Sequence, residues 1–213
     1  MGLIGPNGSG KTTLVNVITG IFVPTSGRIY LDGTDITGWK SFQIARAGVS
    51  RSFQRVRLFA GMPVLENVIV AALTAGFGRA EAVELAHHAL ETMGVAGFEG
   101  RPVTALSYGH ERMVEVARAL AMRPRYLCLD EPAAGLNEEE SRELLARLAP
   151  IPEREGLGML IIDHDMHLIM RLCHRLHVLN YGRTIAEGTP QQVRRVPEVI
   201  EAYLGSSAEI VGA

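Results

Sequence analysis

The sequence predicts an α/β fold built on a mostly parallel sheet, and two observations lead to this class. Short, nearly all-apolar runs end in polar residues at Tyr126–Asp130 and at Met159–His164, as buried parallel strands do. Segments with apolar residues at helical spacing alternate with such runs along the chain. The length of 213 residues suits one large domain, so we predict a single domain over 1–213.

A glycine-rich loop follows the apolar pair Leu3-Ile4 and precedes a helix predicted over about Lys11–Thr19. It fits the phosphate-binding pattern G-x-x-x-x-G-K-[ST]. Glycines let the backbone curl so that its N–H groups point at phosphate oxygens, and the helix adds the positive end of its dipole. Lys11 can reach the β- and γ-phosphates, and the Thr12 hydroxyl can ligate Mg²⁺. The candidate phosphate contacts are Asn7, Gly8, Ser9, Gly10, Lys11, Thr12 and Thr13.

The sequence after this helix predicts a hairpin, a short helix and a strand. Arg28–Leu31 is strand-like, and Asp32-Gly33 is a hairpin turn signal. A helix is expected over Ser41–Ala47, with Ser41 capping its start. Val49–Gln54 is a strand that ends on the polar amide of Gln54.

The region from about residue 60 to 122 is helical. Pro63 suits the first position of one helix, and a second helix is expected over about Arg79–Met93. Ser107-Tyr108-Gly109 opens a third helix that runs to about Met122. Because no strand alternates with these helices, we predict a helical subdomain inserted in the α/β core over about 60–122.

The remaining chain returns to alternating strands and helices. Asn137 can cap a helix that carries three glutamates in its first turn. The other elements expected are a helix from Asp165 to about Cys173, a strand pair Leu176–Asn180 and Arg183–Glu187, and short helices at Pro190–Arg195 and Pro197–Leu204.

The composition of the chain limits the kinds of partner and the cellular compartment that we expect for it. The chain is 47% hydrophobic and 21% charged with a net charge of −2, so we expect a globular protein with no bulk attraction to nucleic acid. The longest apolar run, Val68–Phe77, is short of the roughly 20 residues of a spanning helix, so work at a membrane would need a partner that holds the chain there. Cys128 and Cys173 show no metal-ligand spacing, and their apolar contexts favour a reducing cytosolic compartment.

The phosphate loop alone leaves many nucleotide enzymes open, but the ordered set of motifs resembles the ATP-binding subunits of ATP-binding-cassette (ABC) transporters over the whole chain. The residues that match the family's motifs are Gly5–Thr13 (Walker A loop), Gln54 (Q-loop), Leu106–Glu111 (signature motif), Tyr126–Asp130 with Glu131 (Walker B), Ala134–Asn137 (D-loop) and His164 (switch histidine).

The resemblance implies ATP and Mg²⁺ as cofactors and gives each motif a role. Asp130 would hold Mg²⁺ through water, together with Thr12 and Gln54. Glu131 would act as general base on the attacking water, with Gln54 and His164 as the further catalytic residues. Ser107, Tyr108 and Gly109 would bind the γ-phosphate across a dimer interface, so that two subunits enclose two ATP molecules.

Further residues resemble one ATPase subunit of branched-chain amino-acid importers, notably Arg51-Ser52-Phe53-Gln54, the Tyr108-Gly109 form of the signature, and Val199–Gly205. The resemblance implies integral membrane permease subunits, a second ATPase subunit and, indirectly, a periplasmic or surface substrate-binding protein. It also implies a peripheral location on the cytoplasmic face of the inner membrane. The segment from about Gln54 to Leu73 would face the permease.

Other readings stay open. Importers for urea or short amides share much of the pattern. A non-transport ATPase of the superfamily, a nucleotide-binding module without turnover and a small-molecule kinase are further alternatives, although a kinase would leave Ser107 and His164 unexplained. The sequence departs from the family at His110, where Gln is common, and before the loop, where the family has antiparallel strands and an adenine-stacking aromatic residue. We therefore expect those strands to be missing and name no adenine-stacking residue.

Overall fold

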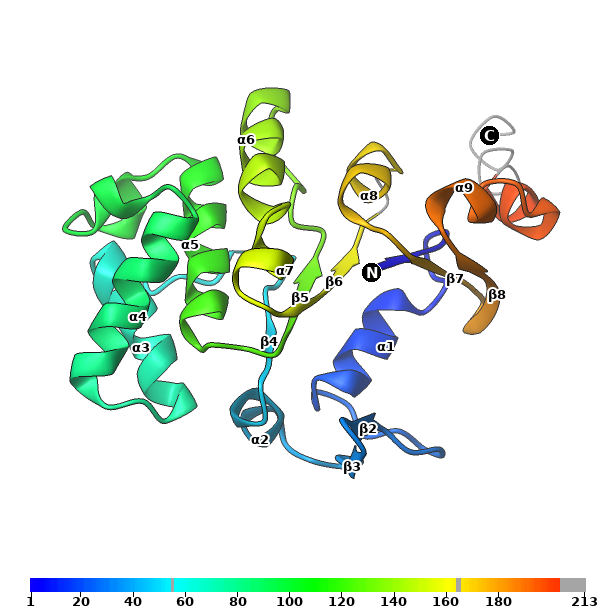
Figure 1. Ribbon diagram of the computed structural model, residues 1–213, viewed down its shortest axis with the longest axis horizontal. Coiled ribbons are helices and arrows are strands. Elements are labelled where there is room, and N and C mark those ends of the chain that lie inside the picture. The colour runs from blue at the N-terminus through cyan, green and yellow to red at the C-terminus, as the bar shows by residue number, and fades with distance from the viewer. Residues whose placement is uncertain (55, 164–165, 204–213) are drawn as a thin grey trace.

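The computed structural model describes residues 1–54, 56–163 and 166–203. A six-stranded sheet runs through the centre of the molecule in the order β4-β5-β6-β1-β7-β8 (Figure 1). Its strands are β1 (Gly2–Ile4), β4 (Val49–Arg51), β5 (Tyr126–Asp130), β6 (Gly158–Ile162), β7 (Leu176–Asn180) and β8 (Arg183–Gly188). All neighbouring pairs are parallel except β7–β8, which is antiparallel. The predicted α/β class with a mostly parallel sheet is confirmed.

Strand β1 occupies an interior position of the sheet. Gly2 lies opposite Ile161 of β6 on one side and opposite Leu176 of β7 on the other. Side chains alternate between the faces, so the neighbours Leu3 and Ile4 belong to two separate apolar clusters. The phosphate loop therefore starts from the middle of a packed sheet.

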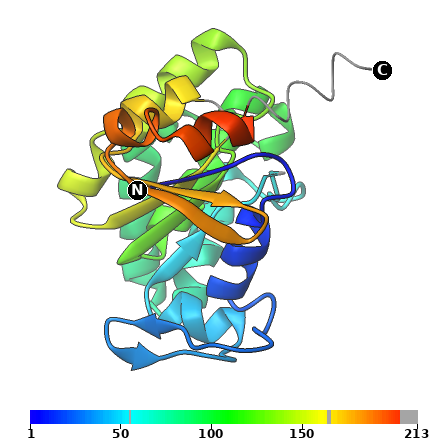
Figure 2. The same cartoon turned by 90° about the vertical axis from the view of Figure 1, so that its right-hand side faces the viewer.

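The helices lie on both faces and at one end of the sheet. The elements beside the core strands are α1 (Lys11–Ile18), α2 (Ser41–Arg46), α6 (Glu138–Leu148), α7 (Ile151–Arg154), α8 (Met166–Leu172) and α9 (Pro190–Val193), and residues 197–203 are also helical. Figure 2 shows α1 on one side of the sheet and α6 with α8 on the other. The small antiparallel sheet of β2 (Tyr30–Leu31) and β3 (Thr34–Asp35) lies apart from the main sheet (Figure 2).

Three helices lie together beyond β4, at one end of the molecule (Figure 1). They are α3 (Val64–Ala75), α4 (Arg79–Thr92) and α5 (Tyr108–Ala121), which pack against one another, with the 3₁₀ turns η1 (Ala96–Phe98) and η2 (Val103–Ala105) between α4 and α5. Their shared contacts are apolar, and Val68, Ala86 and Val114 are all fully buried. The chain returns from this group into β5.

Two expected helix starts were wrong. Lys40, not Ser41, is the N-cap of α2, and the Ser41 hydroxyl donates a hydrogen bond of 3.0 Å to the Gly20 carbonyl instead. Pro63 is the N-cap of α3 rather than its first helical residue. Asn137 caps α6 as predicted, accepting hydrogen bonds from the N–H groups of Glu139 and Glu140.

Within the part of the chain that the structure describes, no helix is both long and apolar enough to cross a membrane.

Candidate nucleotide site

The phosphate loop connects β1 to α1 and has little room for side chains. Gly5, Gly8 and Gly10 have φ angles of 150°, 76° and 101°, a region that favours glycine. A Cβ atom on Gly5 would lie 2.1 Å from the carbonyl oxygen of Leu179, so only glycine lets the loop pack against the end of β7. The Gly182 N–H donates a hydrogen bond of 2.8 Å to the Ser9 carbonyl and holds the other side of the loop.

The side chain of Lys11 lies inside the loop. Its ammonium group donates to the carbonyl oxygens of Gly5 at 2.8 Å and Pro6 at 3.0 Å. Burial lowers the pKa of Lys11, while the charges of Glu131 and Asp130 raise it. The lysine charge therefore faces two carboxylates that follow along the chain more than a hundred residues later.

The first turn of α1 is open to an anion. Gly10, in the left-handed region, is its N-cap and supplies no side-chain cap. The first helical hydrogen bond runs from the Leu14 N–H to the Gly10 carbonyl, so the N–H groups of Lys11, Thr12 and Thr13 are not used by the helix. Thr12 and Thr13 are exposed, as are Asn7 and Gly8 in the loop. These free donors and the helix dipole form a cradle for phosphate oxygens.

Asp130 lies at the end of β5 and is held by an arginine. Its Oδ2 accepts a hydrogen bond of 2.6 Å from Nη2 of Arg51, and both side chains are more than nine-tenths buried. Nη1 of Arg51 also donates to Oδ1 of Asn16 at 2.6 Å and to the Thr19 hydroxyl at 3.3 Å, so Arg51 joins β4, β5 and α1. Arg51 had no predicted role in the site. Its one signal is a charged residue inside the strand-like run Val49–Gln54.

Gln54 and Glu131 are brought into direct contact. The Gln54 side-chain amide donates a hydrogen bond of 2.7 Å from Nε2 to Oε2 of Glu131. Glu131 follows β5 with a φ of 47°, and its N–H donates at 2.7 Å to the Ile162 carbonyl of β6. A left-handed φ is uncommon for a glutamate, so the turn after β5 sets the direction of its carboxylate.

The residues present suit a magnesium ion bound mainly through a nucleotide. The Thr12 hydroxyl, the Asp130 carboxylate and the Gln54 amide oxygen are the hard oxygen donors that Mg²⁺ prefers. Among the described residues no cluster of three or more His, Cys, Asp or Glu side chains could hold a metal by itself. One carboxylate with phosphate and water ligands is the usual arrangement for Mg²⁺ at a triphosphate.

The signature residues begin α5. The Ser107 hydroxyl caps this helix, accepting a hydrogen bond of 3.3 Å from the His110 N–H, and lies 3.1 Å from Nδ1 of His110. The Tyr108 side chain is 41% exposed, and Gly109 is buried against Glu140, whose Oε1 would lie 2.7 Å from a Cβ atom on it. The hydrogen bonds found for Ser107 and Tyr108 within the described chain are made to α5, not to the phosphate loop. His164 lies outside the described residues.

Comparison with known proteins decides the family. A family model described as ABC transporter matches residues 1–134, and a second, described as branched-chain amino acid ATP-binding cassette transporter, matches residues 183–209. The chain belongs to the ABC transporter family. As such, it is an ATP-binding-cassette ATPase of the kind that powers transport.

Curated relatives include two proteins named for branched-chain amino acid transport. The high-affinity branched-chain amino acid transport ATP-binding protein BraF of Pseudomonas aeruginosa is 44% identical over 96% of this chain and 86% of its own length. Its counterpart LivG of Escherichia coli is 43% identical with the same coverage.

Solved structures of cassettes match the fold of this ABC ATPase. The ADP conformation of MJ1267, an ATP-binding cassette of an ABC transporter, superposes with a TM-score of 0.83 at 31% identity and covers 96% of this chain and 87% of that one. A nucleotide-free cassette from an ABC transporter gives a TM-score of 0.82 at 30% identity and covers 95% of this chain and 86% of that one.

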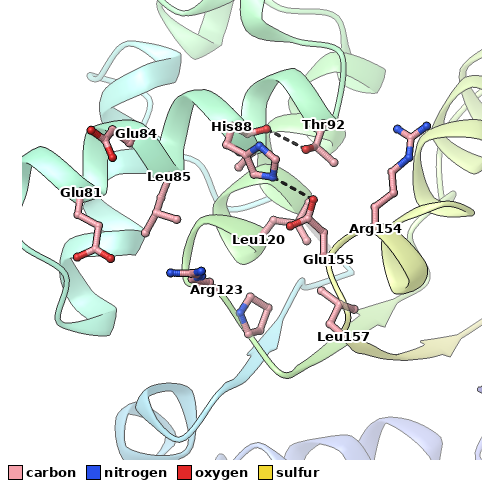
Figure 3. Close-up of a pocket in the computed structure, with 12 residues that line it drawn as sticks. Glu81, Glu84, Leu85, His88, Thr92, Leu120, Arg123, Arg154, Glu155 and Leu157 are labelled. Carbon is pink, nitrogen blue, oxygen red and sulfur yellow. Dashed lines mark hydrogen bonds and ion pairs between the residues drawn. The ribbon is translucent and has the colours of Figure 1, made fainter.

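A cavity of about 510 Å³ lies away from the nucleotide site of this ATPase, between α4, the end of α5 and α7 (Figure 3). His88 of α4 meets Glu155 across it at 3.0 Å. None of the phosphate-loop residues, nor Gln54, Asp130 or Glu131, lines this cavity. It is a junction between helices rather than a second nucleotide pocket.

A second arginine, Arg112, had no predicted role either. Arg112 of α5 has a fully buried side chain that donates at 2.7 Å to the carbonyl oxygens of both Phe53 and Gln54. The signal for it is a charge at helical spacing among the apolar residues of α5, with Glu115 one turn later.

Proposed function

We propose that this ATPase is the ATP-binding and ATP-hydrolysing subunit of an importer for branched-chain amino acids. The observation that carries the hydrolytic part is the 2.7 Å contact of Gln54 with Glu131, beside Asp130 at the ends of neighbouring strands. The match of residues 183–209 to the branched-chain cassette model and the names of the relatives support the transport part.

The chain's own residues would divide the work as follows. The N–H groups of the loop and of the first turn of α1, together with Lys11, would bind the phosphates of ATP. Thr12, Asp130 and Gln54 would supply oxygen ligands for Mg²⁺, which neutralises phosphate charge when bound. The loop contacts are those of Asn7, Gly8, Ser9, Gly10, Lys11, Thr12 and Thr13.

Glu131 would take the proton of the attacking water as general base, and Gln54 would hold its carboxylate in place. His164 would support the same carboxylate and the γ-phosphate. Ser107, Tyr108 and Gly109 would act on the nucleotide of a second ATPase subunit. The exposure of the Tyr108 ring supports a role at such an interface.

Membrane permease subunits would dock beside the Q-loop. A hollow of about 380 Å³ supports this placement, because aromatic and charged side chains from the chain around Gln54 and from α5 line it. Its lining includes Phe53, Arg57, Phe59, Glu115 and Arg118. Such docking would place the chain on the cytoplasmic face of the membrane, with a substrate-binding protein acting indirectly from the other side.

The helices α3, α4 and α5 would move as a unit. Their mutual packing and their place beyond β4 support a helical subdomain over about 60–122, inserted in a single cassette of residues 1–213. ATP binding would close the subunit dimer, and hydrolysis would reset it.

The hydrolytic part is tested by Glu131→Gln. Loss of the general base should lower kcat for ATP hydrolysis by about 10²–10⁴-fold while the affinity for ATP stays. Lys11→Ala should instead lose nucleotide binding. Glu84→Gln, on an exposed position of α4, is the matched control and should behave as wild type. Near-wild-type turnover in Glu131→Gln would remove Glu131 from the role of base.

The transport part is tested by uptake in source cells that lack this gene. Wild type should restore uptake of radiolabelled leucine, and Glu131→Gln should not. Restored uptake of urea or acetamide instead of leucine would favour the related short-amide importers. No change in any of the three would point to a non-transport ATPase.

A further inference from the structure

We propose that Arg112 is a positioning residue that ties the Q-loop main chain to α5, so that the position of the signature motif in a subunit governs the contact between Gln54 and Glu131 in the same subunit. The inference rests on the proposed roles of Gln54 and Glu131.

The contacts of Arg112 converge on two consecutive Q-loop residues. Nη1 donates to the Phe53 carbonyl at 2.7 Å, and Nη2 donates to the Gln54 carbonyl at 2.7 Å. Nη1 also donates to Oε2 of Glu115 at 2.8 Å, and the other oxygen of Glu115 accepts the Phe53 N–H at 3.4 Å. The pair therefore holds both main-chain polar groups of Phe53 and the carbonyl of Gln54.

The geometry continues from this pair to the catalytic carboxylate. With its main chain fixed to α5, Gln54 extends its side chain to Glu131 at 2.7 Å. A shift of α5 relative to β5 would move the Gln54 amide with it, because the guanidinium fork is planar and rigid. Hydrogen bonds of this length tolerate little displacement.

Burial indicates that the pair serves position more than stability. The Arg112 side chain is 0% exposed and that of Glu115 is 5% exposed. Removing two charges from water costs several kcal/mol per ion, and well-packed apolar residues of similar volume are often as stable. Because Arg112 donates to the carbonyl groups of Phe53 and Gln54, the buried pair fixes the conformation of the Q-loop.

Tyr108 extends the link from the Q-loop to the D-loop. Its hydroxyl lies 3.2 Å from Nη2 of Arg112, and its ring packs on Gly135, where a Cβ atom would lie 3.0 Å from the ring. Gly135 belongs to Ala134–Asn137, which begins three residues after Glu131. The tyrosine in the signature motif thus joins the segments on both sides of the Gln54–Glu131 contact.

The test is a double-mutant cycle on ATP hydrolysis by the full chain. Arg112→Lys keeps the charge that balances Glu115 but cannot span two carbonyls with a fixed fork, so the variant should fold. We expect kcat to fall about tenfold, equivalent to about 1.4 kcal/mol, with KM within about twofold. In the Gln54→Ala background the same substitution should change kcat by less than about twofold, because its effect passes through Gln54.

Val114→Ala, fully buried on the same helix, is the control for a general loss of packing in α5. A second readout is hydrogen exchange at the Phe53 amide, which should become faster in Arg112→Lys and stay unchanged in Val114→Ala. If Arg112→Lys does not fold, the apolar pair Arg112→Met with Glu115→Leu takes its place in the same cycle.

A tenfold loss of kcat that persists in the Gln54→Ala background would overturn the proposal. An unchanged rate of hydrogen exchange at the Phe53 amide in Arg112→Lys would overturn it as well. The failure of the proposed function looks different: Gln54→Ala and Glu131→Gln would then keep wild-type turnover by themselves.

Discussion

The described chain has two buried arginine–carboxylate pairs, and they do different work. Arg51 with Asp130 lies in the sheet, beside the phosphate loop, and its carboxylate is a candidate ligand of Mg²⁺. Arg112 with Glu115 lies on α5, and Arg112 binds main-chain carbonyls of the Q-loop. The comparison indicates that burial of an ion pair does not by itself mark a catalytic group, since what the remaining donors and oxygens contact decides the role.

The largest expected effect is on the rate of ATP hydrolysis, when the negative charge of Asp130 at the metal site is removed. Asp130→Asn should lower kcat by at least about 100-fold, because it removes an oxygen ligand worth several kcal/mol of charge stabilisation. Asp35→Asn, in the exposed strand β3, is the matched control with wild-type turnover. Steady-state ATP hydrolysis over a Mg²⁺ titration measures both, and a loss below tenfold in Asp130→Asn would mean that other groups hold the metal.

The next effect is on stability and should separate the pairs through magnesium. Arg51→Met and Arg112→Met should each lower the free energy of unfolding by about 3–5 kcal/mol, because each leaves a buried carboxylate without its partner. Mg²⁺ with ADP should restore part of the loss in Arg51→Met, where the cation balances Asp130, but not in Arg112→Met.

Thermal unfolding with ADP alone and with Mg²⁺ and ADP checks this difference. Equal gains in Tm for the two variants would show that the cation does not act at Asp130.

A smaller effect follows from the titration of Glu115. Burial raises the pKa of Glu115 above its ordinary value of 4.5, while the Arg112 charge opposes the shift. The Glu115 carboxyl therefore binds a proton more tightly in the folded chain than in the unfolded chain. The folded state gains stability as the pH falls through the raised pKa, and this gain is complete below pH 4.5. Wild type should gain stability on acidification relative to Glu115→Gln. Urea unfolding from pH 7.5 down to 4.5 measures the difference in free energy of unfolding between the two proteins. A difference that stays constant over this range would contradict the prediction.

The smallest effect is local exposure of a thiol. Cys128 lies opposite Arg51 in the β4–β5 register, is 3% exposed, and burial raises its pKa to about 11. It should resist alkylation at pH 8 in wild type and in Arg112→Met, but react measurably in Arg51→Met. Peptide mass spectrometry separates it from Cys173, the buried internal reference. Equal labelling in both variants would argue against a local effect of Arg51.

The strands that carry the site follow closely from the sequence. β5 and β7 have the predicted bounds, because apolar runs that end in polar residues are typical of buried strands. The capped start of α6 was equally visible, since an Asn before three glutamates satisfies the helix N-terminus locally. Local patterns thus predicted these elements, whereas the strand expected over Val49–Gln54 ends at Arg51.

The links between motifs were not predictable. Arg51 and Asp130 are 79 residues apart in sequence, and Arg112 and Phe53 are 59 apart, so their pairing depends on which strands become neighbours. Ser41 illustrates the same limit: a hydroxyl suited to capping its own helix bonds Gly20 instead, 21 residues away. Local sequence patterns indicate which hydrogen bonds a residue can make, but they do not indicate which distant residue becomes its partner in the fold.

The interior position of β1 has a consequence for biosynthesis. Both neighbours of β1 come from far downstream, and Ser9 of the phosphate loop accepts a hydrogen bond from Gly182. A ribosome adds residues one after another, so the loop leaves the exit tunnel well before β6 and β7, the strands that flank β1. The nucleotide pocket therefore forms only after β6, β7 and Gly182 have been translated, and a chain terminated before β6 would carry the phosphate-binding motif without the ability to bind ATP.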